Sequence, residues 1–384
     1  MIEATTGRYI ETTVAGETVR AFVPNPLPQK LTKKDLASLQ ELIRAAEAAL
    51  ERLKLADEMI PSMDWFVYSF VRKEALLTSE IEGTQATLAD VMSYEQTGQS
   101  GSSDVADVVE VTNYVRAANY AFDQLGSAKG LPVSTRLLDE CHHRLMQGVR
   151  GKDKQPGEIR RSQVWVGGTR PGNAVFVPPP WDNVRDLLGA LETYIHSDDD
   201  LPPLLRIAAV HAQFETIHPY LDGNGRIGRL LIALLLAHWR VLDTPLLYLS
   251  VYLKEHQAEY YDQLSAIRKS GIWTNWFRFF LEGIKQVATD AAATASALNQ
   301  QVNKDRKILL SANSITVSAI QLFELLPEHP VISMPLVTRL LDTTKPTAGK
   351  AIELLQQNDV LREMGDRKRD RTYCYSSYLS ILTS

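Results

Sequence analysis

The segment from His218 to Arg229 combines most of the side-chain types that phosphoryl chemistry needs. It reads His-Pro-Tyr-Leu-Asp-Gly-Asn-Gly-Arg-Ile-Gly-Arg. Gly223 and Gly225 allow backbone amides to converge without obstruction from a Cβ atom. Amides at the start of a helix, with the helix dipole behind them, bind phosphate. The spacing therefore predicts a phosphate-binding loop that leads into a helix.

Four side chains in this segment have complementary roles. The imidazole of His218 can accept a proton near neutral pH. The carboxylate of Asp222 suits a Mg²⁺ ion that bridges phosphates. Arg226 and Arg229 lie three residues apart, hence on one face of the helix, and offer two guanidinium groups to phosphate oxygens. No residue of the segment is an obvious covalent nucleophile, so we expect direct in-line attack on a phosphoryl centre.

The glycines admit two other interpretations. Gly223, Gly225 and Gly228 match the dinucleotide fingerprint, and Asp243 follows at a suitable distance. That fold requires a strand before the glycines, whereas residues 204–214 have a helical period. A glycine-rich turn between core helices, without a function, does not account for the histidine, the aspartate and the two arginines.

Composition is that of an ordinary globular chain. The 384 residues are 45% hydrophobic and 23% charged, which suits two or three domains. A net charge of −5 argues against nucleic-acid binding by the whole surface. The two cysteines, Cys141 and Cys374, indicate no disulfide framework. Residues 1–24 lack the apolar run of a signal peptide, and Leu230–Leu236 is too short to cross a bilayer. A soluble cytoplasmic protein is expected.

Apolar periodicity predicts a mainly α-helical fold. The first thirty residues are predicted to be irregular, and Thr32 is predicted to cap the first long helix. A helix over 65–80 is predicted to end at Gly83, and Ser100–Asp104 is predicted to be an exposed loop. Further helices are predicted over 105–125, 135–149, 181–196 and 203–217, after Gly225, around Tyr260-Tyr261, over 273–280, and through about Arg306 as a long polar helix.

Two segments have β-type patterns. In Arg161–Pro180, short β-runs at 164–166 and 175–177 flank a loop rich in glycine, proline and asparagine, which predicts a β-hairpin. Residues 311–384 are predicted to form a winged helix, with three helices and two β-runs around a charged tip at Asp366–Arg371. The predicted domains are an N-terminal helical region (1–104), a core (105–300) and this C-terminal domain (311–384).

The segment His218–Arg229 resembles the signature of the Fic (Fido) family of protein adenylyltransferases, His-x-Phe-x-Asp/Glu-Gly-Asn-Gly-Arg-x-x-Arg. Tyr220 replaces the phenylalanine, and the resemblance extends over about residues 1–300. It implies a Fic-type helical core in which the predicted hairpin is a flap. It also implies transfer of AMP from ATP, with Mg²⁺, onto a Ser, Thr or Tyr hydroxyl of a target protein or of the chain itself.

The resemblance also implies roles for individual residues. His218 would deprotonate the target hydroxyl, Asp222 would hold the metal ion, and Arg229 would reach the γ-phosphate. Tyr260 and Tyr261 would line the adenine pocket, although core packing explains them equally well. The nucleotide-binding stretch would comprise Asp222, Gly223, Asn224, Gly225, Arg226, Ile227, Gly228 and Arg229.

The flap and an earlier helix carry two further implied roles. The target would dock on the flap edge by main-chain pairing, with an ordinary structural hairpin as the alternative. Residues 78–83 match the pattern Ser/Thr-x-x-x-Glu-Gly of an N-terminal inhibitory helix, in which Glu82 would pair with Arg229 and displace the γ-phosphate. The alternative is a simple helix end. The docking edge would comprise Gln163, Val164, Trp165, Val166 and Gly167.

Several questions stay open from the sequence. A DNA-binding regulator whose core only senses nucleotide is the rival function, with DNA contacts through residues 311–384. A donor other than ATP would leave a phosphate or UMP adduct instead of AMP. The family resemblance suggests a homodimer. His142, His143 and His211 lack partners at metal-ligand spacing, so His211 is interpreted as a packed or bridging histidine.

Overall fold

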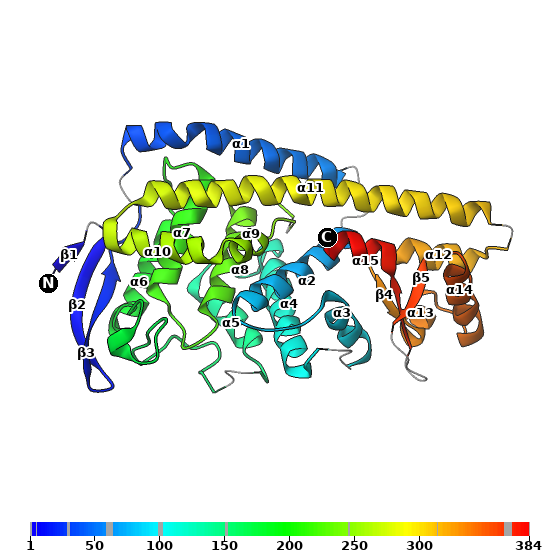
Figure 1. Cartoon of the computed structure of the whole chain (residues 1–384), viewed down its shortest axis with the longest axis horizontal. Coiled ribbons are helices and arrows are strands. Elements are labelled where there is room, and N and C mark those ends of the chain that lie inside the picture. Colours follow the sequence, from blue (N-terminus) through cyan, green and yellow to red (C-terminus); the bar gives the residue numbers. More distant parts are fainter. Residues whose placement is uncertain are drawn as a thin grey trace. The chain divides into compact units, whose positions relative to one another are not determined.

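The computed structural model describes residues 2–4, 6–28, 31–58, 64–98, 103–149, 153–244, 246–312, 314–364 and 371–383. These residues form a mainly helical fold, as predicted (Figure 1). Within the described ranges, no helix combines the length and the apolarity that a membrane crossing needs.

The chain folds into two compact units. The first comprises Met1–Leu50 and Asn113–Ala288, and the second comprises Glu51–Thr112 and Thr289–Ser384. The boundaries between them fall inside three helices, so each of these helices contributes residues to both units. The predicted domains, residues 1–104, 105–300 and 311–384, are each one continuous stretch of the sequence. This division stays a prediction. The three shared helices are α1 (Lys33–Glu58), α4 (Val105–Gly126) and α11 (Trp273–Ser311).

A three-stranded antiparallel sheet begins the first unit, so the prediction of an irregular N-terminus was wrong. Ala15 and Gly16 have φ angles of 48° and 83°. Two consecutive positive φ angles make the two-residue turn whose twist matches that of paired strands, and Val14 pairs with Glu17 across it. The alternating residues around Gly16 carried this signal. The strands, in sheet order, are β1 (Ile2–Ala4), β2 (Gly7–Val14) and β3 (Glu17–Pro24).

The core of the first unit is built around α7 (Pro203–Ile217), which coincides with its predicted range. This helix is buried almost all round, and α8 (Asn224–His238) packs along it (Figure 1). Such burial is typical of a central helix. The remaining elements of the unit are α5 (Thr135–Leu145), the 3₁₀ turns Pro171–Asn173 and Trp181–Asn183, α6 (Val184–Ile195), α9 (Ser250–Glu255) and α10 (Gln257–Ser270).

Two predicted helices at the end of the core are one element. The aromatic segment from Trp273 and the polar segment through Arg306 form the single helix α11. Its start lies beside α1, because the hydroxyl of Thr274 donates a hydrogen bond to Asp35 at 3.4 Å. The side-chain oxygen of Thr32 accepts the N–H of Asp35 at 3.2 Å, which confirms the predicted cap of α1.

The predicted flap hairpin is confirmed, with shorter strands than expected. Val166 and Phe176 form an isolated antiparallel bridge, with N–H to carbonyl distances of 2.8 and 3.1 Å. The second arm is also fastened to the N-terminal sheet, since the N–H of Phe22 donates to the carbonyl of Val177 at 3.0 Å. The flap therefore has a fixed support on the side of β3.

The second unit contains helices from both ends of the chain. Helix α2 (Asp64–Ile81) matches the prediction, whereas α3 (Leu88–Thr97) was missed. Its capping signals are present: the side chain of Thr87 accepts from the N–H of Asp90, and Gly98 is left-handed. Of the predicted loop at Ser100–Asp104, residues 100–102 lie outside the described residues.

The C-terminal part of this unit combines short helices with a three-stranded sheet in the order β4-β6-β5. The two predicted β-runs and all three predicted helices are present, but the first strand and the last helix were missed. Of the charged tip, Asp366–Asp370 lie outside the described residues. The elements are α12 (Val317–Leu325), β4 (Val331–Ser333), α13 (Met334–Leu340), α14 (Lys345–Gln357), β5 (Leu361–Met364), β6 (Thr372–Tyr375) and α15 (Ser376–Thr383).

Candidate active site

The segment that starts at His218 joins α7 to α8, as predicted. His218 ends α7 in the left-handed conformation, with φ 52° and ψ 63°, so the chain leaves the helix in a sharp turn. Gly223 is also left-handed, with φ 77°, and it immediately precedes α8. A Cβ atom there would be strained and would lie 3.2 Å from the sulfur of Met146. The turn itself therefore calls for glycine at this position.

Asn224 holds the loop closed from inside. Its side-chain oxygen accepts a hydrogen bond from the N–H of Tyr220 at 2.8 Å, and its amide nitrogen donates to the carbonyl of Tyr220 at 2.9 Å. The residue is 2% exposed. Only a side chain with both a donor and an acceptor can satisfy this pair. The sequence predicted a phosphate contact for Asn224, and the structure shows that its side chain stabilises the loop.

The loop places a carboxylate beside the start of α8. Oδ1 of Asp222 accepts from the N–H of Gly223 at 2.6 Å and lies 3.7 Å from a terminal nitrogen of Arg226. Helix geometry leaves the first amides of α8, those of Asn224 and Gly225, without a carbonyl partner in the helix. Such amides bind anions. The arrangement can therefore receive phosphate oxygens next to a carboxylate.

The carboxylate of Asp222 fits a magnesium ion that is held mostly by its substrate. Its side chain is 42% exposed, so a hydrated cation can reach it. Among the described residues, no three His, Cys, Asp or Glu side chains gather into a metal site. Mg²⁺ commonly takes one or two carboxylates and completes its shell with phosphate and water oxygens. One carboxylate beside a phosphate-binding loop meets that requirement.

Both arginines of the segment are held inside the protein. Arg226 is 3% exposed and Arg229 is 4% exposed. A terminal nitrogen of Arg226 lies 3.9 Å from the sulfur of Met146, which follows α5. Packing of this kind fixes a guanidinium before a ligand arrives, and a fixed guanidinium loses less entropy on binding an oxyanion.

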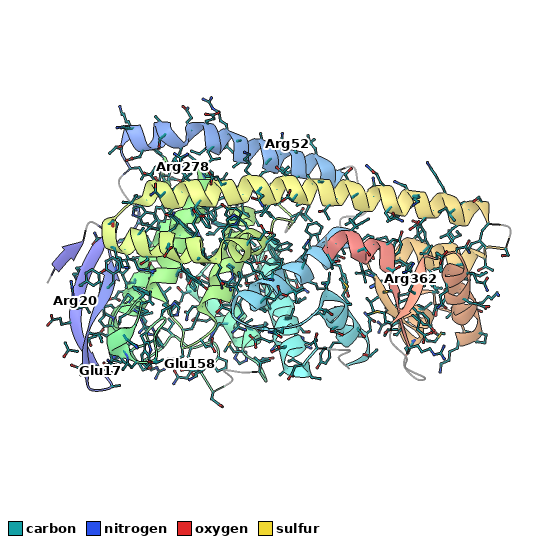
Figure 2. All side chains as sticks on the ribbon, viewed as in Figure 1. Glu17, Arg20, Arg52, Glu158, Arg278 and Arg362 are labelled. Atoms are coloured by element: carbon teal, nitrogen blue, oxygen red, sulfur yellow. The ribbon has the colours of Figure 1, made fainter. Side chains whose placement is uncertain are left out.

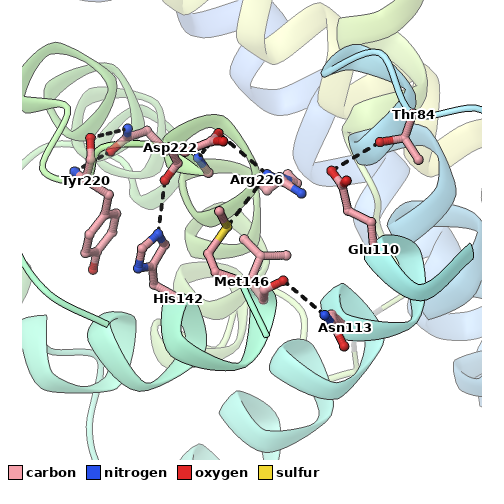
Figure 3. A network of polar contacts seen from close by, with 11 residues as sticks. Thr84, Glu110, Asn113, His142, Met146, Tyr220, Asp222 and Arg226 are labelled. Carbon is pink, nitrogen blue, oxygen red and sulfur yellow. Dashed lines mark hydrogen bonds and ion pairs between the residues drawn. The ribbon is translucent and has the colours of Figure 1, made fainter. Parts of the chain in front are cut away.

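His142, considered above only as a metal ligand, supports the loop from α5. Its ring stacks on that of Tyr220, with centroids 3.9 Å apart. Its Nδ1 accepts the N–H of Gly157 at 2.8 Å, which leaves the Nε2 proton to be donated to the carbonyl of Asp222 at 3.0 Å (Figure 3). Burial lowers the pKa of His142 to about 4. It is therefore a neutral clamp with a single tautomer.

Tyr220, the one departure from the family signature, makes a contact that phenylalanine could not make. Its hydroxyl donates to Oδ1 of Asp139, on α5, at 2.9 Å. Burial raises the pKa of Asp139 to about 6, although the hydrogen bond from Tyr220 opposes this. The hydroxyl thus fastens the turn to α5 a second time, beside the stacked ring of His142.

Arg160 connects the flap to the loop, and the sequence did not indicate it. Its Nε donates to the carbonyl of His218 at 2.8 Å. Its terminal nitrogens donate to the carbonyls of Ser162 at 3.0 Å and Pro179 at 2.6 Å, one on each arm of the flap. The residue is 1% exposed, and burial lowers its pKa to about 10. All its partners are backbone carbonyls, so no sequence pattern reveals it.

His211 bridges core groups, as predicted. Its Nδ1 donates to the carbonyl of Gly228 at 2.9 Å, and its Nε2 accepts from the hydroxyl of Tyr260 at 2.9 Å. Burial lowers its pKa to about 3, so it stays neutral. Tyr260 is 1% exposed and packs near Trp276, whereas Tyr261 is 46% exposed. Contact with adenine stays a prediction for both tyrosines.

The predicted inhibitory residue lies just beyond α2, in the second unit. Gly83, with φ 94°, ends the helix as predicted. The N–H of Thr84 returns to the carbonyl of Ser79 at 3.1 Å, and its hydroxyl donates to Glu110 at 3.2 Å (Figure 3). The side chain of Glu82 is exposed. Its inhibitory role stays a prediction.

The predicted docking edge of the flap is only partly exposed. The side-chain nitrogen of Gln163 donates to the carbonyl of Pro178 at 2.8 Å, across the hairpin. Val166 pairs with Phe176, and Trp165 is 38% exposed. Target docking at residues 163–167 stays a prediction.

Comparisons with known proteins agree on one family. Residues 40–123 match the model "Fic/DOC family N-terminal", and residues 132–236 match the model "Fic/DOC family". The chain is similar to the protein adenylyltransferase Fic of Drosophila willistoni, with 29% identity over 211 residues, 54% of this chain and 39% of that protein. The Culex quinquefasciatus protein of the same name is 28% identical over 195 residues, 50% of this chain and 36% of that protein. The matches thus span less than half of these relatives.

Solved structures share the fold. A Fic family protein from Desulfovibrio desulfuricans G20 has a TM-score of 0.56 and 19% identity, and the match covers 91% of this chain and 98% of that one. Fic-1 (residues 134–508) from C. elegans has a TM-score of 0.52 and 19% identity, covering 69% of this chain and 74% of that one.

Proposed function

The chain belongs to the Fic/DOC family, and from that premise we propose that it transfers AMP from ATP to a hydroxyl side chain of a protein. The observation that carries the proposal is the closed loop between His218 and α8. It brings an imidazole-bearing turn, a half-exposed carboxylate and a helix start with inward arginines into one place. Relatives named protein adenylyltransferases add support.

The proposed reaction is an in-line displacement at the α-phosphorus. The imidazole of His218 takes the proton of the target hydroxyl as that oxygen attacks, and pyrophosphate leaves from the opposite side. The left-handed backbone of His218, whose carbonyl is held by Arg160, sets the direction of the side chain. No covalent intermediate with the protein is needed.

The phosphate chain is assigned to the start of α8. The amides of Gly223, Asn224 and Gly225, with Arg226, bind the α- and β-phosphates, and Arg229 binds the γ-phosphate. Asp222 would hold a Mg²⁺ ion, which supplies charge neutralisation between phosphate oxygens when it is bound. Ile227 is buried under this turn and Gly228 gives its carbonyl to His211, so both keep the helix start in place.

We assign to Glu82 the role of an inhibitor. The sequence pattern at 78–83 and the glycine-ended helix support it. A glutamate carboxylate pairs with a guanidinium in the same forked geometry as a phosphate, so pairing with Arg229 would exclude the γ-phosphate. The resting enzyme would then be slow.

The target is assigned to the flap. An extended segment of the target, or of a second copy of the chain, would pair with the backbone of Val164–Gly167 on the side away from Phe176. Such pairing reads the backbone rather than the side chains, so Ser, Thr and Tyr hydroxyls are all admissible acceptors.

A radiolabel experiment tests this function. With α-³²P-ATP and Mg²⁺, label on protein should rise with Glu82→Gly and vanish with His218→Ala. Glu80→Gln against Glu82→Gln is a matched pair, because both carboxylates lie at the same helix end. His143→Ala, an exposed histidine, controls for His218→Ala. Mass spectrometry separates an AMP adduct from UMP or phosphate. Equal labelling by wild type and Glu82→Gly would remove the inhibitory role, and label that persists in His218→Ala would remove the base.

A second function concerns the C-terminal elements. We propose that residues 311–384 form a winged helix that contacts DNA. Three helices with a sheet in the order β4-β6-β5 support it, as do the exposed Lys345 and Lys350 of α14. A gel shift of the whole chain should weaken with rising salt and with Lys350→Glu. No shift at low salt would remove DNA as a partner.

A further inference from the structure

A cavity of about 300 Å³ lies outside the loop, in the first unit. Its walls come from three elements: the β2–β3 hairpin, the second arm of the flap and α10. None of the residues His218–Arg229 lines it. The residues that matter for its chemistry are Tyr9, Arg20, Phe176, Val177, Arg268 and Lys269.

Arg268 is the unusual member of this wall. It is 9% exposed, and its guanidinium lies over the ring of Phe176, 4.0 Å from the centroid. Within the part of the chain that the structure describes, this guanidinium forms no hydrogen bond and no ion pair. Burial lowers the pKa of Arg268 to about 10, and the charge of Glu215 opposes this shift, so Arg268 remains charged near neutral pH.

A buried cation without a partner is costly. Proteins normally satisfy such a group with a carboxylate or with carbonyls, as Arg160 is satisfied here. Arg268 instead presents its donors to a cavity. The position suits an anionic ligand that accepts hydrogen bonds from this guanidinium.

The other charged side chains that line the cavity are also positive. Arg20 is exposed and lies over the ring of Tyr9, 4.7 Å from the centroid, and Lys269 is exposed. The described residues that line the cavity include no carboxylate. The nearby Glu17 is engaged by Arg170 of the flap. Figure 2 shows Arg20 and Glu17 on the same hairpin.

The apolar parts of the wall narrow the choice of anion. Phe176 and Val177 are buried and lie beside the guanidinium. A phosphate group would find an apolar surface there, whereas phosphate sites are usually lined by converging amides. A glutamate or aspartate side chain fits better, because its methylene groups can lie on the apolar wall while its carboxylate meets Arg268.

The position of the cavity indicates which molecule would supply this acidic side chain. Phe176 pairs with Val166, which belongs to the predicted docking edge. A polypeptide paired on the far side of Val166 lies two strand spacings, roughly 10 Å, from Phe176. Its continuation past the flap would meet Pro171, Gly172 and Val175, which also line the cavity. We propose that this cavity is an acidic-residue subsite, which binds an Asp or Glu side chain of the polypeptide that docks on the flap. The proposal rests on the proposed AMP transfer and names a preference among its targets.

Peptide binding without ATP tests the subsite apart from the chemistry. The probes are short fluorescein-labelled peptides with a central Thr, in which one Glu is moved through the flanking positions, each paired with a Gln version. For the whole wild-type chain, fluorescence anisotropy should show one position where Glu binds about tenfold more tightly than Gln, the effect of one charge-assisted contact. Arg268→Gln should remove that difference.

Three controls make the result decisive. Arg20→Gln and Lys269→Gln, both at exposed positions, should reduce the Glu preference, and they test the proposal even if Arg268→Gln fails to fold. Arg278→Gln, at an exposed arginine of α11 that does not line the cavity, should leave the preference unchanged. Inorganic phosphate and acetate, added as competitors, should displace the Glu peptide only weakly.

The outcomes separate the two proposals. No Glu preference at any position, or a preference that persists in Arg268→Gln, overturns the subsite. Tight binding of free phosphate that depends on Arg268 overturns the polypeptide as its source. If Glu peptides bind as expected but receive no label from α-³²P-ATP in the Glu82→Gly form, the transfer fails and the subsite stands. If label appears without a Glu preference, the transfer stands and the subsite fails.

Discussion

Two buried arginines of the first unit have opposite surroundings. Arg160 donates to backbone carbonyls of the flap and of His218. Arg268 lines a cavity, with its guanidinium over the ring of Phe176 and with no hydrogen bond to any described residue. The first residue completes the structure of the loop before any ligand arrives. In our proposal, the second keeps its hydrogen-bond donors for a ligand. A buried guanidinium can therefore either stabilise the fold or be available to a ligand, and its hydrogen-bond partners decide which.

The same substitution at both arginines should separate them most strongly. Arg160→Met leaves several backbone carbonyls without a donor and should cost about 3 kcal/mol of unfolding free energy. Arg268→Met removes a charge that makes no hydrogen bond to a described residue and should change stability by less than about 1 kcal/mol. Urea unfolding of both variants measures this. An equal loss for the two would mean that Arg268 has a structural partner of its own.

Asn224→Ala tests whether the loop is stabilised by one of its own side chains. The change leaves the N–H and the carbonyl of Tyr220 unsatisfied, so we expect about 2 kcal/mol of destabilisation. Transfer should also fall about tenfold or more, since the amides of the turn lose their geometry. Asn303→Ala, at an exposed position of α11, should stay within about 0.5 kcal/mol of the wild type. A stable but equally active Asn224→Ala protein would contradict this view of the loop.

The effect of the neutral clamp His142 is absent at neutral pH and is visible only in the pH dependence of stability. Its folded pKa of about 4 lies below the ordinary histidine value of 6.5. Its contribution is therefore fully present above pH 6.5 and is lost as the pH falls towards 4. Over this window the loss approaches about 1.4 kcal/mol per pH unit. Urea unfolding between pH 7 and 4 should show a shallower loss for His142→Gln than for the wild type.

Two other groups set the limits of that experiment. Burial also lowers the pKa of His211, to about 3, so part of the acid sensitivity persists in the variant. The raised pKa of Asp139, about 6, acts in the opposite direction, because its contribution is lost as the pH rises through 6. His143→Gln, at an exposed position, serves as the control. Identical pH profiles for His142→Gln and the wild type would show that His142 protonates freely in the fold.

Local signals in the sequence predicted most of the elements around the site. The helical period of residues 203–217, the glycines after Asp222 and the cap at Thr32 each depend on neighbours a few positions away. The N-terminal sheet was missed although Gly16 marks its turn, because the prolines that follow drew the interpretation towards irregular chain. Helix α3 was missed despite its caps at Thr87 and Gly98.

The residues that stabilise the geometry of the site could not be predicted from the sequence. Arg160 acts on carbonyls up to 58 positions away, and His142 acts on a carbonyl 80 positions away. Every residue type has a backbone carbonyl, so the identity of a residue does not show which side chain will bind its carbonyl.

The sequence alone determined which chemical groups the loop contains, because imidazole, carboxylate, guanidinium and glycine occur there in an order that short-range geometry brings together. The tertiary structure alone decided which of the other buried charges are satisfied within the fold and which face a cavity. That distinction depends on packing between distant segments, where a guanidinium finds carbonyls in one place and open space in another.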